Sequence, residues 1–257
     1  MTAAGGPLAP LLADPRATGV FSDFDGTLSP IVDDPDEAAP LPGVADALAD
    51  LAGRFGRVGV ISGRPASFLL HHLGTAGVQM WGLHGLETVA DGAVVPVPEA
   101  EPWLDVVEEA AEGAVRDLGP DVHVERKGLS LTVHFRRAAH RGPATREWAE
   151  RTAAANGLVL HDARMSYELR PPVAHGKGLV LERAAGGLAA ACFVGDDLSD
   201  ADAFDALDRL AARGVAAVRV GVHSEEAPPQ LLDRADMVLD GPEDVLAMLR
   251  TLAGSAT

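Results

Sequence analysis

Residues 21–31 read FSDFDGTLSPI, a short apolar run that leads into two aspartates one residue apart. Gly26 and Thr27 follow at once, so Asp23 and Asp25 stand where a buried strand gives way to a turn. In open α/β folds, ligands bind beyond the carboxyl ends of the sheet strands. The stretch therefore predicts a strand with a polar site immediately after it.

Short apolar runs alternate with helical patterns on both sides of this stretch. In residues 42–55 and 199–212 the apolar side chains recur at spacings of three and four, which is typical of amphipathic helices. Ser199 is expected to cap the second of these helices. Alternating strands and helices indicate an α/β, Rossmann-like core with a parallel sheet and helices on both faces. The expected core strands are residues 19–22, 58–62, 78–83, 190–195, 215–220 and 237–239.

The middle of the chain, residues 97–173, has a different pattern of expected helices and strands. It reads as a helix at 102–118, two strands, a helix at 143–156 and two further strands. Apolar and polar residues alternate from Leu129 to Arg136, so one face of this sheet is apolar and the other polar. If the two helices cover the apolar face, the polar face is left for a ligand, as in an α/β cap that closes over a larger core. The expected domains are a first core part at 1–96, an inserted cap at 97–173 and a second core part at 174–257.

Composition excludes several classes of protein. The 257 residues are 47% hydrophobic and 23% charged, which is typical of a soluble globular protein, and no apolar stretch is long enough for a membrane span. We expect a cytoplasmic protein. A formal charge of -17 opposes binding to nucleic acids and to anionic membranes. Cys192 is the single cysteine, so an intramolecular disulfide is excluded, and it reads as a buried core residue.

Polar groups follow several of the other expected elements. Ser62 in VISGR follows the second strand, Lys177 in AHGKG begins a helix, and Asp196 and Asp197 in FVGDD follow a later strand. Each pattern alone is typical of an ordinary turn or a solvated pair. Together, converging carboxylates, a hydroxyl and a lysine indicate a site for Mg²⁺ and phosphate, because Mg²⁺ prefers oxygen ligands from carboxylates, water and phosphate.

The order of these motifs resembles the four signature motifs of the haloacid dehalogenase superfamily of phosphohydrolases, and more closely the family of trehalose-6-phosphate phosphatases. The likeness runs from about residue 20 to 240. The stretches that carry it are DFDGTLSPIV after Ser22, GLHGLE at 82–87, VERKGLSLTVHFR at 124–136, YELRPPV at 167–173 and GDDLSDADAFDAL at 195–207.

The resemblance implies a role for each core residue. Asp23 would be the nucleophile that forms an aspartyl-phosphate, and Asp25 the general acid and base. Ser62 and Lys177 would hold the phosphoryl oxygens. Mg²⁺ would be bound by the Asp23 carboxylate, the Asp25 carbonyl and Asp196, with support from Asp197 and Asp200.

The resemblance also assigns the sugar ligands to the polar face of the cap. Glu125 and Lys127 share one strand face, and Glu168 and Arg170 repeat this arrangement on another. Without the motifs, an exposed polar face would be the simpler interpretation. For Arg170, as for Glu87, a structural salt bridge is as acceptable as a ligand contact. The core residues expected to contact the sugar are Arg64, His84 and Gly85.

We therefore predict a Mg²⁺-dependent phosphatase that converts trehalose 6-phosphate to trehalose and phosphate, acting as a monomer. The alternatives are a phosphatase of another sugar phosphate, such as mannosyl-3-phosphoglycerate or a pseudo-disaccharide phosphate, and a non-catalytic sugar-phosphate sensor that regulates a synthase. A binding module has no use for a nucleophile beside its acid, which argues against the sensor.

Overall fold

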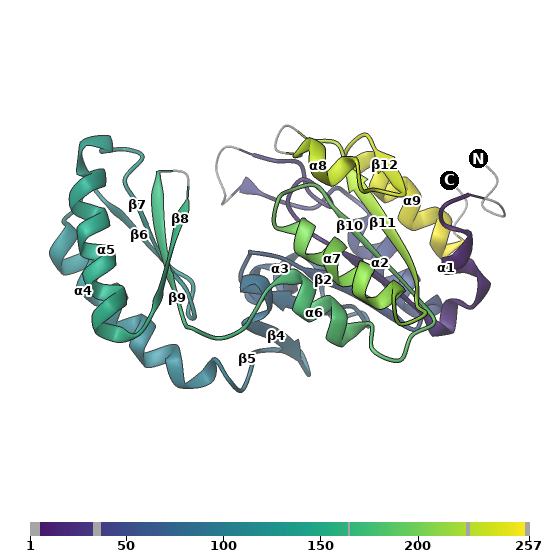
Figure 1. The fold of residues 1–257 in the computed structure, drawn as a ribbon, viewed down its shortest axis with the longest axis horizontal. Helices are drawn as coiled ribbons and strands as arrows, with labels where there is room; N and C mark the ends of the chain where they lie inside the picture. The colour runs from purple at the N-terminus through teal and green to yellow at the C-terminus, as the bar shows by residue number, and fades with distance from the viewer. Residues whose placement is uncertain (1–5, 33–36, 164, 225–226, 255–257) are drawn as a thin grey trace. The chain divides into compact units, whose positions relative to one another are not determined.

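The computed structural model describes residues 6–32, 37–163, 165–224 and 227–254. The chain divides into two compact units (Figure 1). Each unit has its own cluster of buried apolar side chains. The core unit comprises the chain up to Val94 and from His175 onward, and the inserted unit is Val95–Ala174.

The core unit is built on one eight-stranded sheet in the order β12-β11-β10-β1-β2-β3-β4-β5. The pairs from β12 to β3 are parallel, and β4 runs antiparallel to β3. Strands covered on both faces read as continuous apolar runs, and every residue of β1 and β10 is buried. The strands are β1 (Thr18–Ser22), β2 (Arg57–Ile61), β3 (Gln79–Gly82), β4 (Glu87–Ala90), β5 (Ala93–Pro96), β10 (Ala190–Gly195), β11 (Ala216–Val222) and β12 (Met237–Leu239).

Helices cover both faces of this sheet (Figure 1). Apolar residues of α1 (Ala9–Ala13), α2 (Val44–Arg54), α3 (Ala66–Leu73) and α9 (Pro242–Ala253) share one core cluster with alternate strand residues such as Val20. Those of α6 (Lys177–Ala184), α7 (Asp200–Ala211) and α8 (Pro229–Leu232) share the other, with Phe21 and Phe193. The described part of this unit also includes the short 3₁₀ helices η1 (Pro15–Ala17) and η3 (Leu83–Gly85).

The inserted unit is a four-stranded antiparallel sheet in the order β6-β7-β9-β8. Its two long helices and one sheet face enclose a separate core that includes Val107, Leu131 and Trp148. The elements are η4 (Glu101–Trp103), α4 (Leu104–Leu118), β6 (His123–Arg126), β7 (Leu131–His134), η5 (Ala139–Arg141), α5 (Gly142–Asn156), β8 (Val159–Ala163) and β9 (Ser166–Arg170).

The fold class predicted from the sequence is confirmed: a parallel α/β core is interrupted by an α/β insertion. The predicted core strands are all present, and Cys192 is fully buried in β10. Strands β4 and β5 were not predicted, because they are four residues long and largely lack a buried apolar run. Among the described residues, each helix is too short or too polar to cross a bilayer.

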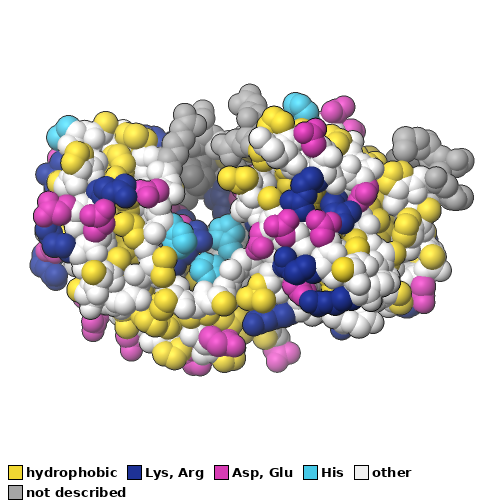
Figure 2. Space-filling view, viewed as in Figure 1, with side chains coloured by type: hydrophobic (Ala, Val, Ile, Leu, Met, Phe, Trp, Pro, Cys, Tyr) yellow, Lys and Arg dark blue, Asp and Glu magenta, His cyan; other side chains and the backbone are white. Residues whose placement is uncertain are grey.

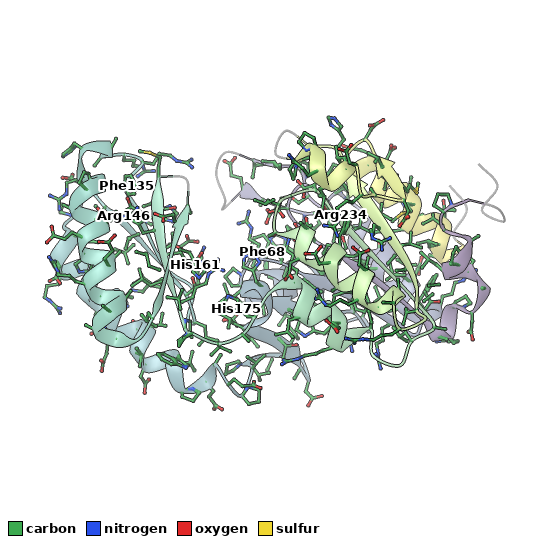
Figure 3. All side chains as sticks on the ribbon, in the orientation of Figure 1. Phe68, Phe135, Arg146, His161, His175 and Arg234 are labelled. Atoms are coloured by element: carbon green, nitrogen blue, oxygen red, sulfur yellow. The ribbon has the colours of Figure 1, made fainter. Side chains whose placement is uncertain are left out.

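Surface charge is mixed rather than concentrated on the face seen in Figure 2, where basic and acidic side chains alternate over α7. Ion pairs account for part of this pattern. Arg234 lies 2.8 Å from Asp208, and Arg219 lies 3.0 Å from Asp236. Arg234 projects from this side of the core unit in Figure 3. Exposed pairs of this kind contribute little stability, so they serve mainly to offset the acidic surface.

Candidate functional site

The carboxyl ends of three neighbouring core strands carry polar residues predicted from the sequence. Asp23 follows β1, Ser62 follows β2 and Asp196 follows β10, and these strands are adjacent in the sheet. The backbone N–H of Asp23 donates to the carbonyl of Val194, 2.8 Å away, and thus ties the end of β1 to β10. The topology therefore gathers these residues at the sheet edge where α/β folds bind ligands.

Lys177 places a positive charge within this group. It begins α6, and only 2% of its side chain is exposed. Its Nζ lies 2.7 Å from Asp200 Oδ1, 3.0 Å from Asp23 Oδ1 and 3.8 Å from Asp197 Oδ1. Burial alone would lower the pKa of this ammonium group, but the Asp200 and Asp23 carboxylates outweigh burial and raise it. Lys177 therefore remains charged and holds these carboxylates together.

Asp200 organises the loop between β10 and α7. Its Oδ2 accepts hydrogen bonds from the backbone N–H groups of Asp196 and Asp197, at 2.9 and 3.0 Å, while its Oδ1 faces Lys177. A Cβ atom at Gly195 would lie 2.3 Å from the Asp200 carboxyl carbon. The close approach of the loop to this carboxylate therefore requires glycine.

The start of α7 differs from the expected cap. Ser199 occupies the N-cap position, but its side chain makes no capping hydrogen bond. Its hydroxyl instead donates to Asp197 Oδ1 at 2.7 Å, and the same oxygen accepts the Asp200 backbone N–H at 3.2 Å. The prediction that Ser199 caps the helix is wrong. Asp197 does so, because its carboxylate reaches the first turn and suits the positive end of the helix dipole.

Hydroxyl groups hold Asp196. Thr27 Oγ1 donates to its Oδ1 at 3.2 Å, and Ser224 Oγ donates to its Oδ2 at 2.8 Å. Burial raises the pKa of Asp196 to about 6, although the Ser224 hydrogen bond opposes this rise. Thr27 could have been proposed from its place in the DFDGT motif. Ser224 carries no comparable signal, because it follows β11 in an unremarkable loop.

Three carboxylates at this edge form a group that could hold a metal ion. One oxygen from each of Asp23, Asp197 and Asp200 lies within 4.8 Å of the others. Burial raises the pKa of Asp23 well above its usual value, although Lys177 acts in the opposite direction. A single ammonium thus faces three carboxylates, of which those of Asp23 and Asp200 are buried, and a further cation would relieve their mutual repulsion. The group is compatible with a metal site, although it does not include the carboxylates of Asp196 and Asp25.

Asp25 forms an ion pair that the sequence did not indicate. Arg64 Nε lies 2.9 Å from Asp25 Oδ2 and Arg64 Nη2 lies 2.7 Å from Oδ1, a two-pronged contact that fixes the carboxylate plane. The guanidinium also lies 4.8 Å from the ring centre of Phe68. Arg64 was expected to contact a sugar. In the structure it orients Asp25, a partner 39 residues away that spacing alone cannot reveal.

A strained segment joins the loops of Ser62 and Lys177. His84 in η3 has φ +54°, its N–H donates to the Ser62 carbonyl and its carbonyl accepts the Gly176 N–H, each at 2.8 Å. The Ser62 hydroxyl accepts the Arg64 backbone N–H at 3.1 Å. The His84 backbone is therefore a structural link between the phosphate-binding candidates, which are Ser62 and Lys177.

On the polar face of the inserted sheet, neighbouring side chains bind the carboxylates of Glu125 and Glu168. Glu125 Oε2 lies 2.9 Å from His134 Nε2 and 3.2 Å from Lys127 Nζ. Burial alone would raise the pKa of Glu125, but the bonds to His134 and Lys127 lower it. His161 projects from β8 on the side away from α4 and α5 (Figure 3).

Glu168 is more enclosed than Glu125, with 13% of its side chain exposed. The Ser130 hydroxyl donates to its Oε1, and Arg170 Nη2 donates to its Oε2. Burial alone would raise the pKa of Glu168, but the bond and charge of Arg170 and the Ser130 bond lower it to about 2. The structural ion pair considered for Arg170 is therefore present. For Glu87, the structure shows a buried carboxylate that accepts the Ala66 N–H at 2.9 Å, at the start of α3.

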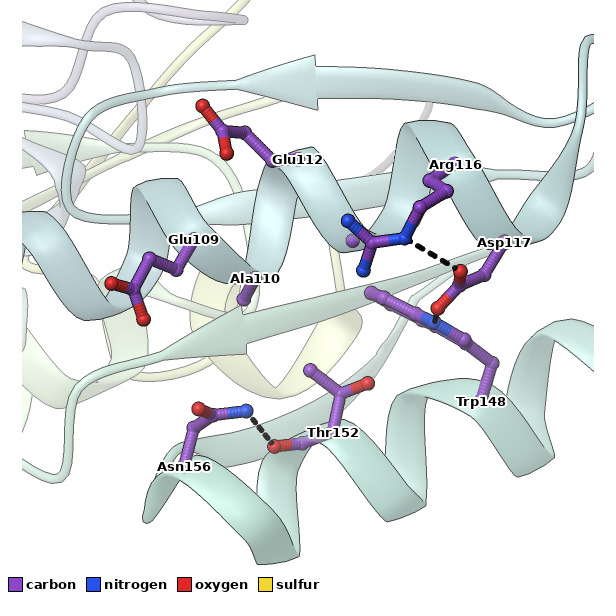
Figure 4. A pocket seen from close by; sticks show the side chains of 9 residues that line it. Glu109, Ala110, Glu112, Arg116, Asp117, Trp148, Thr152 and Asn156 are labelled. Carbon is purple, nitrogen blue, oxygen red and sulfur yellow. Dashed lines mark hydrogen bonds and ion pairs between the residues drawn. The ribbon is translucent and has the colours of Figure 1, made fainter.

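A pocket of about 360 Å³ lies between α4 and α5 of the inserted unit (Figure 4). Arg116 and Asp117 from α4 meet Trp148 from α5, whose indole N–H donates to Asp117 at 3.3 Å. Its remaining polar lining is mostly exposed carboxylates and amides, and it contains none of the predicted site residues. We therefore regard it as a surface groove between two packed helices.

Comparison with known proteins agrees with the resemblance of the motifs. The family model for trehalose-phosphatase matches residues 21–233. A trehalose-phosphate phosphatase from Mycobacterium leprae is 37% identical over 216 residues, which cover 78% of this chain and 50% of that protein. One from Mycobacterium avium is 38% identical, covering 78% of this chain and 54% of that protein. This chain thus spans about half the length of these relatives.

A solved structure supports the same assignment. The crystal structure of a trehalose-6-phosphate phosphatase related protein matches with a TM-score of 0.75 and 25% identity, covering 92% of this chain and 97% of that one. The match therefore includes nearly the whole described fold rather than the sheet alone. This chain belongs to the trehalose-phosphatase family.

Proposed function

We propose that this chain is a Mg²⁺-dependent phosphatase that hydrolyses trehalose 6-phosphate to trehalose and phosphate. The observation that carries the proposal is the buried Lys177 ammonium between Asp23 and Asp200, at the sheet edge that also bears Ser62. Phosphoryl transfer needs a nucleophile and positive charge at one place, and this edge offers both. Membership of the family supports the choice of substrate.

Asp23 acts as the nucleophile in this proposal. A carboxylate oxygen attacks phosphorus, the bond from phosphorus to the sugar oxygen breaks, and an aspartyl-phosphate forms. Asp25, released from its two-pronged contact with Arg64 and protonated, gives its proton to the departing sugar oxygen. It then takes a proton from the water that attacks phosphorus, which releases phosphate and restores the Asp23 carboxylate. While Asp25 is ionised, Arg64 holds its carboxylate through two hydrogen bonds.

The remaining residues bind and orient. Lys177 and Ser62 hold the phosphoryl oxygens and offset their charge. A magnesium ion, when bound, neutralises further charge on the phosphoryl group and orients it. It fits here because one ammonium faces three carboxylates. The proposed metal-binding residues are Asp23, Asp25 through its carbonyl, and Asp196, supported by Asp197 and Asp200. The proposed sugar-binding residues are Glu125, Lys127, Glu168 and Arg170 of the inserted unit and Arg64, His84 and Gly85 of the core unit.

The test is phosphate release over a panel of sugar phosphates that includes trehalose 6-phosphate, glucose 6-phosphate and mannosyl-3-phosphoglycerate. We expect the highest kcat/KM for trehalose 6-phosphate, loss of activity with a chelator and recovery with Mg²⁺. Asp23→Asn should lower turnover by orders of magnitude while the fold survives. Preference for another sugar phosphate would contradict the substrate, and near-normal turnover by folded Asp23→Asn would contradict the aspartyl-phosphate.

A further inference from the structure

The polar face of the inserted sheet is organised around its strand β7. In the sheet register Thr132 of β7 stands directly between Glu125 of β6 and Glu168 of β9. Ser130 and His134 lie two residues to either side of Thr132, so their side chains share this face. Thr132 and His134 of β7, with Ser130 directly before this strand, therefore place three polar side chains between two carboxylates.

Each carboxylate is held by a diagonal contact, one from His134 of β7 and one from Ser130 directly before β7. His134 Nε2 lies 2.9 Å from Glu125 Oε2, and the Ser130 hydroxyl donates to Glu168 Oε1. Diagonal neighbours across adjacent strands are close enough for such contacts when one side chain is long. Each carboxylate thus has a partner in or next to β7 as well as a cation two residues further along its own chain segment.

The contacts leave acceptor capacity for a ligand. His134 and Lys127 both meet Oε2 of Glu125, which leaves Oε1 outside these two contacts. A carboxylate can accept about four hydrogen bonds, so Glu125 can still receive donors. Its side chain remains 38% exposed. A held but accessible carboxylate suits recognition of a hydroxyl, which can donate to it.

Fold stability alone does not explain this arrangement. Thr132 is buried, and its Oγ1 has no hydrogen-bond partner among the described residues. A buried hydroxyl without a partner is destabilising, and charged pairs in a partly buried row gain little over apolar packing. The opposite face of the same strand carries Leu131 and Val133 in the apolar core, so β7 would be anchored without the polar row.

We propose that His134 and Ser130 are positioning residues that set the Glu125 and Glu168 carboxylates for the hydroxyls of the leaving sugar. The inference rests on the proposed function, in which these carboxylates bind the sugar. A carboxylate already fixed in one rotamer loses less conformational freedom when ligand binds, and this preorganisation favours affinity. His134 and Ser130 act through Glu125 and Glu168 and do not themselves take part in the phosphoryl chemistry.

The test compares four variants on trehalose 6-phosphate and on an aryl phosphate that has no sugar hydroxyls. His134→Phe and Ser130→Ala remove the two supports. His123→Phe and Ser166→Ala are matched controls, because both residues flank His134 in the register of the same sheet face. We expect each support variant to lower kcat/KM for trehalose 6-phosphate by roughly 10-fold or more, mainly through KM, with an aryl phosphate rate near wild type. His134→Gln, which retains a side-chain donor, should recover much of the loss.

Several results would overturn the inference. Losses no larger than those of the control variants would show that the supports are dispensable, and equal losses on both substrates would indicate a general structural effect. Failure of the proposed function is seen separately, in the wild-type chain, as a preference for another sugar phosphate. In that case the same variants are compared on the preferred substrate, and unchanged KM values there would reject the positioning role itself.

Discussion

Lys177 shows how strongly one side chain can determine this site. Its ammonium is buried between Asp23 and Asp200, whose pKa values burial raises. The charges compensate one another, so removal of the cation leaves carboxylates that water cannot solvate. Lys177 therefore supports the fold of this edge, and in the proposed function the same ammonium also binds the phosphoryl group.

We predict that Lys177→Met lowers the free energy of unfolding by about 3–5 kcal/mol at pH 7. The loss should be smaller at pH 5. A buried carboxylate whose folded pKa is raised destabilises the folded state at high pH, where it is ionised, and protonation removes this cost as the pH falls. Loss of the Lys177 ammonium raises these pKa values further, so the cost at pH 7 increases. Denaturant unfolding of wild type and variant at the two pH values measures the difference. A loss that is equal at both pH values would contradict buried, ionised carboxylates as its cause.

Glu168 predicts the opposite dependence on pH. Its folded pKa of about 2 lies below its usual value of 4.5, so its contribution to stability is complete above pH 4.5, declines below that and is lost as the pH falls through 2. The contribution is on the order of 3 kcal/mol. Glu168→Gln should therefore be less stable than wild type at pH 6, and the difference should fall to about a quarter of that value at pH 2.5.

The measurement for Glu168 can be confined to the inserted unit. Trp103 and Trp148 both belong to it, and Trp81 of the core unit can be replaced by Phe. Unfolding followed by the remaining tryptophan fluorescence then reports on the unit that contains Glu168. A stability difference between Glu168→Gln and its parent that does not change between pH 6 and pH 2.5 would show that Glu168 is not held as described.

At the scale of single residues, the sequence predicted which polar residues lie at the sheet edge better than it predicted which side chains they contact. Asp23, Ser62 and Asp196 could be placed at one sheet edge, because each follows a strand. The pairing of Arg64 with Asp25 could not be predicted, because it depends on where the chain returns after β2. The cap of α7 was wrongly assigned to Ser199, because the residue type does not show which way a side chain points in a tight loop.

At the scale of elements, prediction succeeded where burial imposes a pattern. Strands β1 and β10 are buried on both faces and read as apolar runs, and the apolar residues of β7 alternate as expected of a half-buried strand. Strands β4 and β5 escaped prediction because they are short and partly exposed. The side-chain pairs across the inserted sheet depend on the register between neighbouring strands. Several registers would keep the same residues on the apolar face, so the sequence does not single out one of them.

Segment η3 gives a prediction at this scale. Gly85 has φ +100°, and a Cβ atom there would lie 2.3 Å from Val180 Cγ2 of α6. Gly85→Ala should strain the backbone and push on the helix that begins with Lys177, which should cost about 1–3 kcal/mol of stability and lower kcat on every phosphate ester. Gly187→Ala is the matched control, because Gly187 has φ +79° and its Cβ would meet nothing within 4 Å.

The comparison of these two variants separates backbone strain from displacement of α6. Thermal or denaturant unfolding and kcat on an aryl phosphate are measured for both. Gly187→Ala should lose stability through strain alone and keep its kcat. If both variants behave alike in stability and activity, contact between Gly85 and Val180 has no part in positioning Lys177.

At the scale of the whole molecule, the two units divide the proposed work by chemistry. The core unit gathers carboxylates around one buried ammonium, while the inserted unit has polar side chains on one sheet face and an apolar core on the other. The sequence revealed this division because the two periodicities differ: parallel strands alternate with helices in one part and antiparallel strands alternate residue by residue in the other. If the inserted unit binds only the sugar, a phosphate ester without a sugar should be hydrolysed without its help. The two roles can therefore be separated by comparing two substrates.

The last prediction separates sugar recognition from phosphate chemistry. Glu125→Ala, Lys127→Ala and Glu168→Ala should each lower kcat/KM for trehalose 6-phosphate by roughly 30- to 1000-fold, because a site built to bind hydroxyls is left with unpaired polar groups. The same variants should hydrolyse an aryl phosphate at rates near wild type, since that ester presents no sugar hydroxyls. Lys177→Ala should damage both activities, because both esters carry the same phosphoryl group. Equal losses on both substrates for the inserted-unit variants would mean that these residues support the fold alone, and near-normal trehalose 6-phosphate hydrolysis in all three would point to a different sugar phosphate.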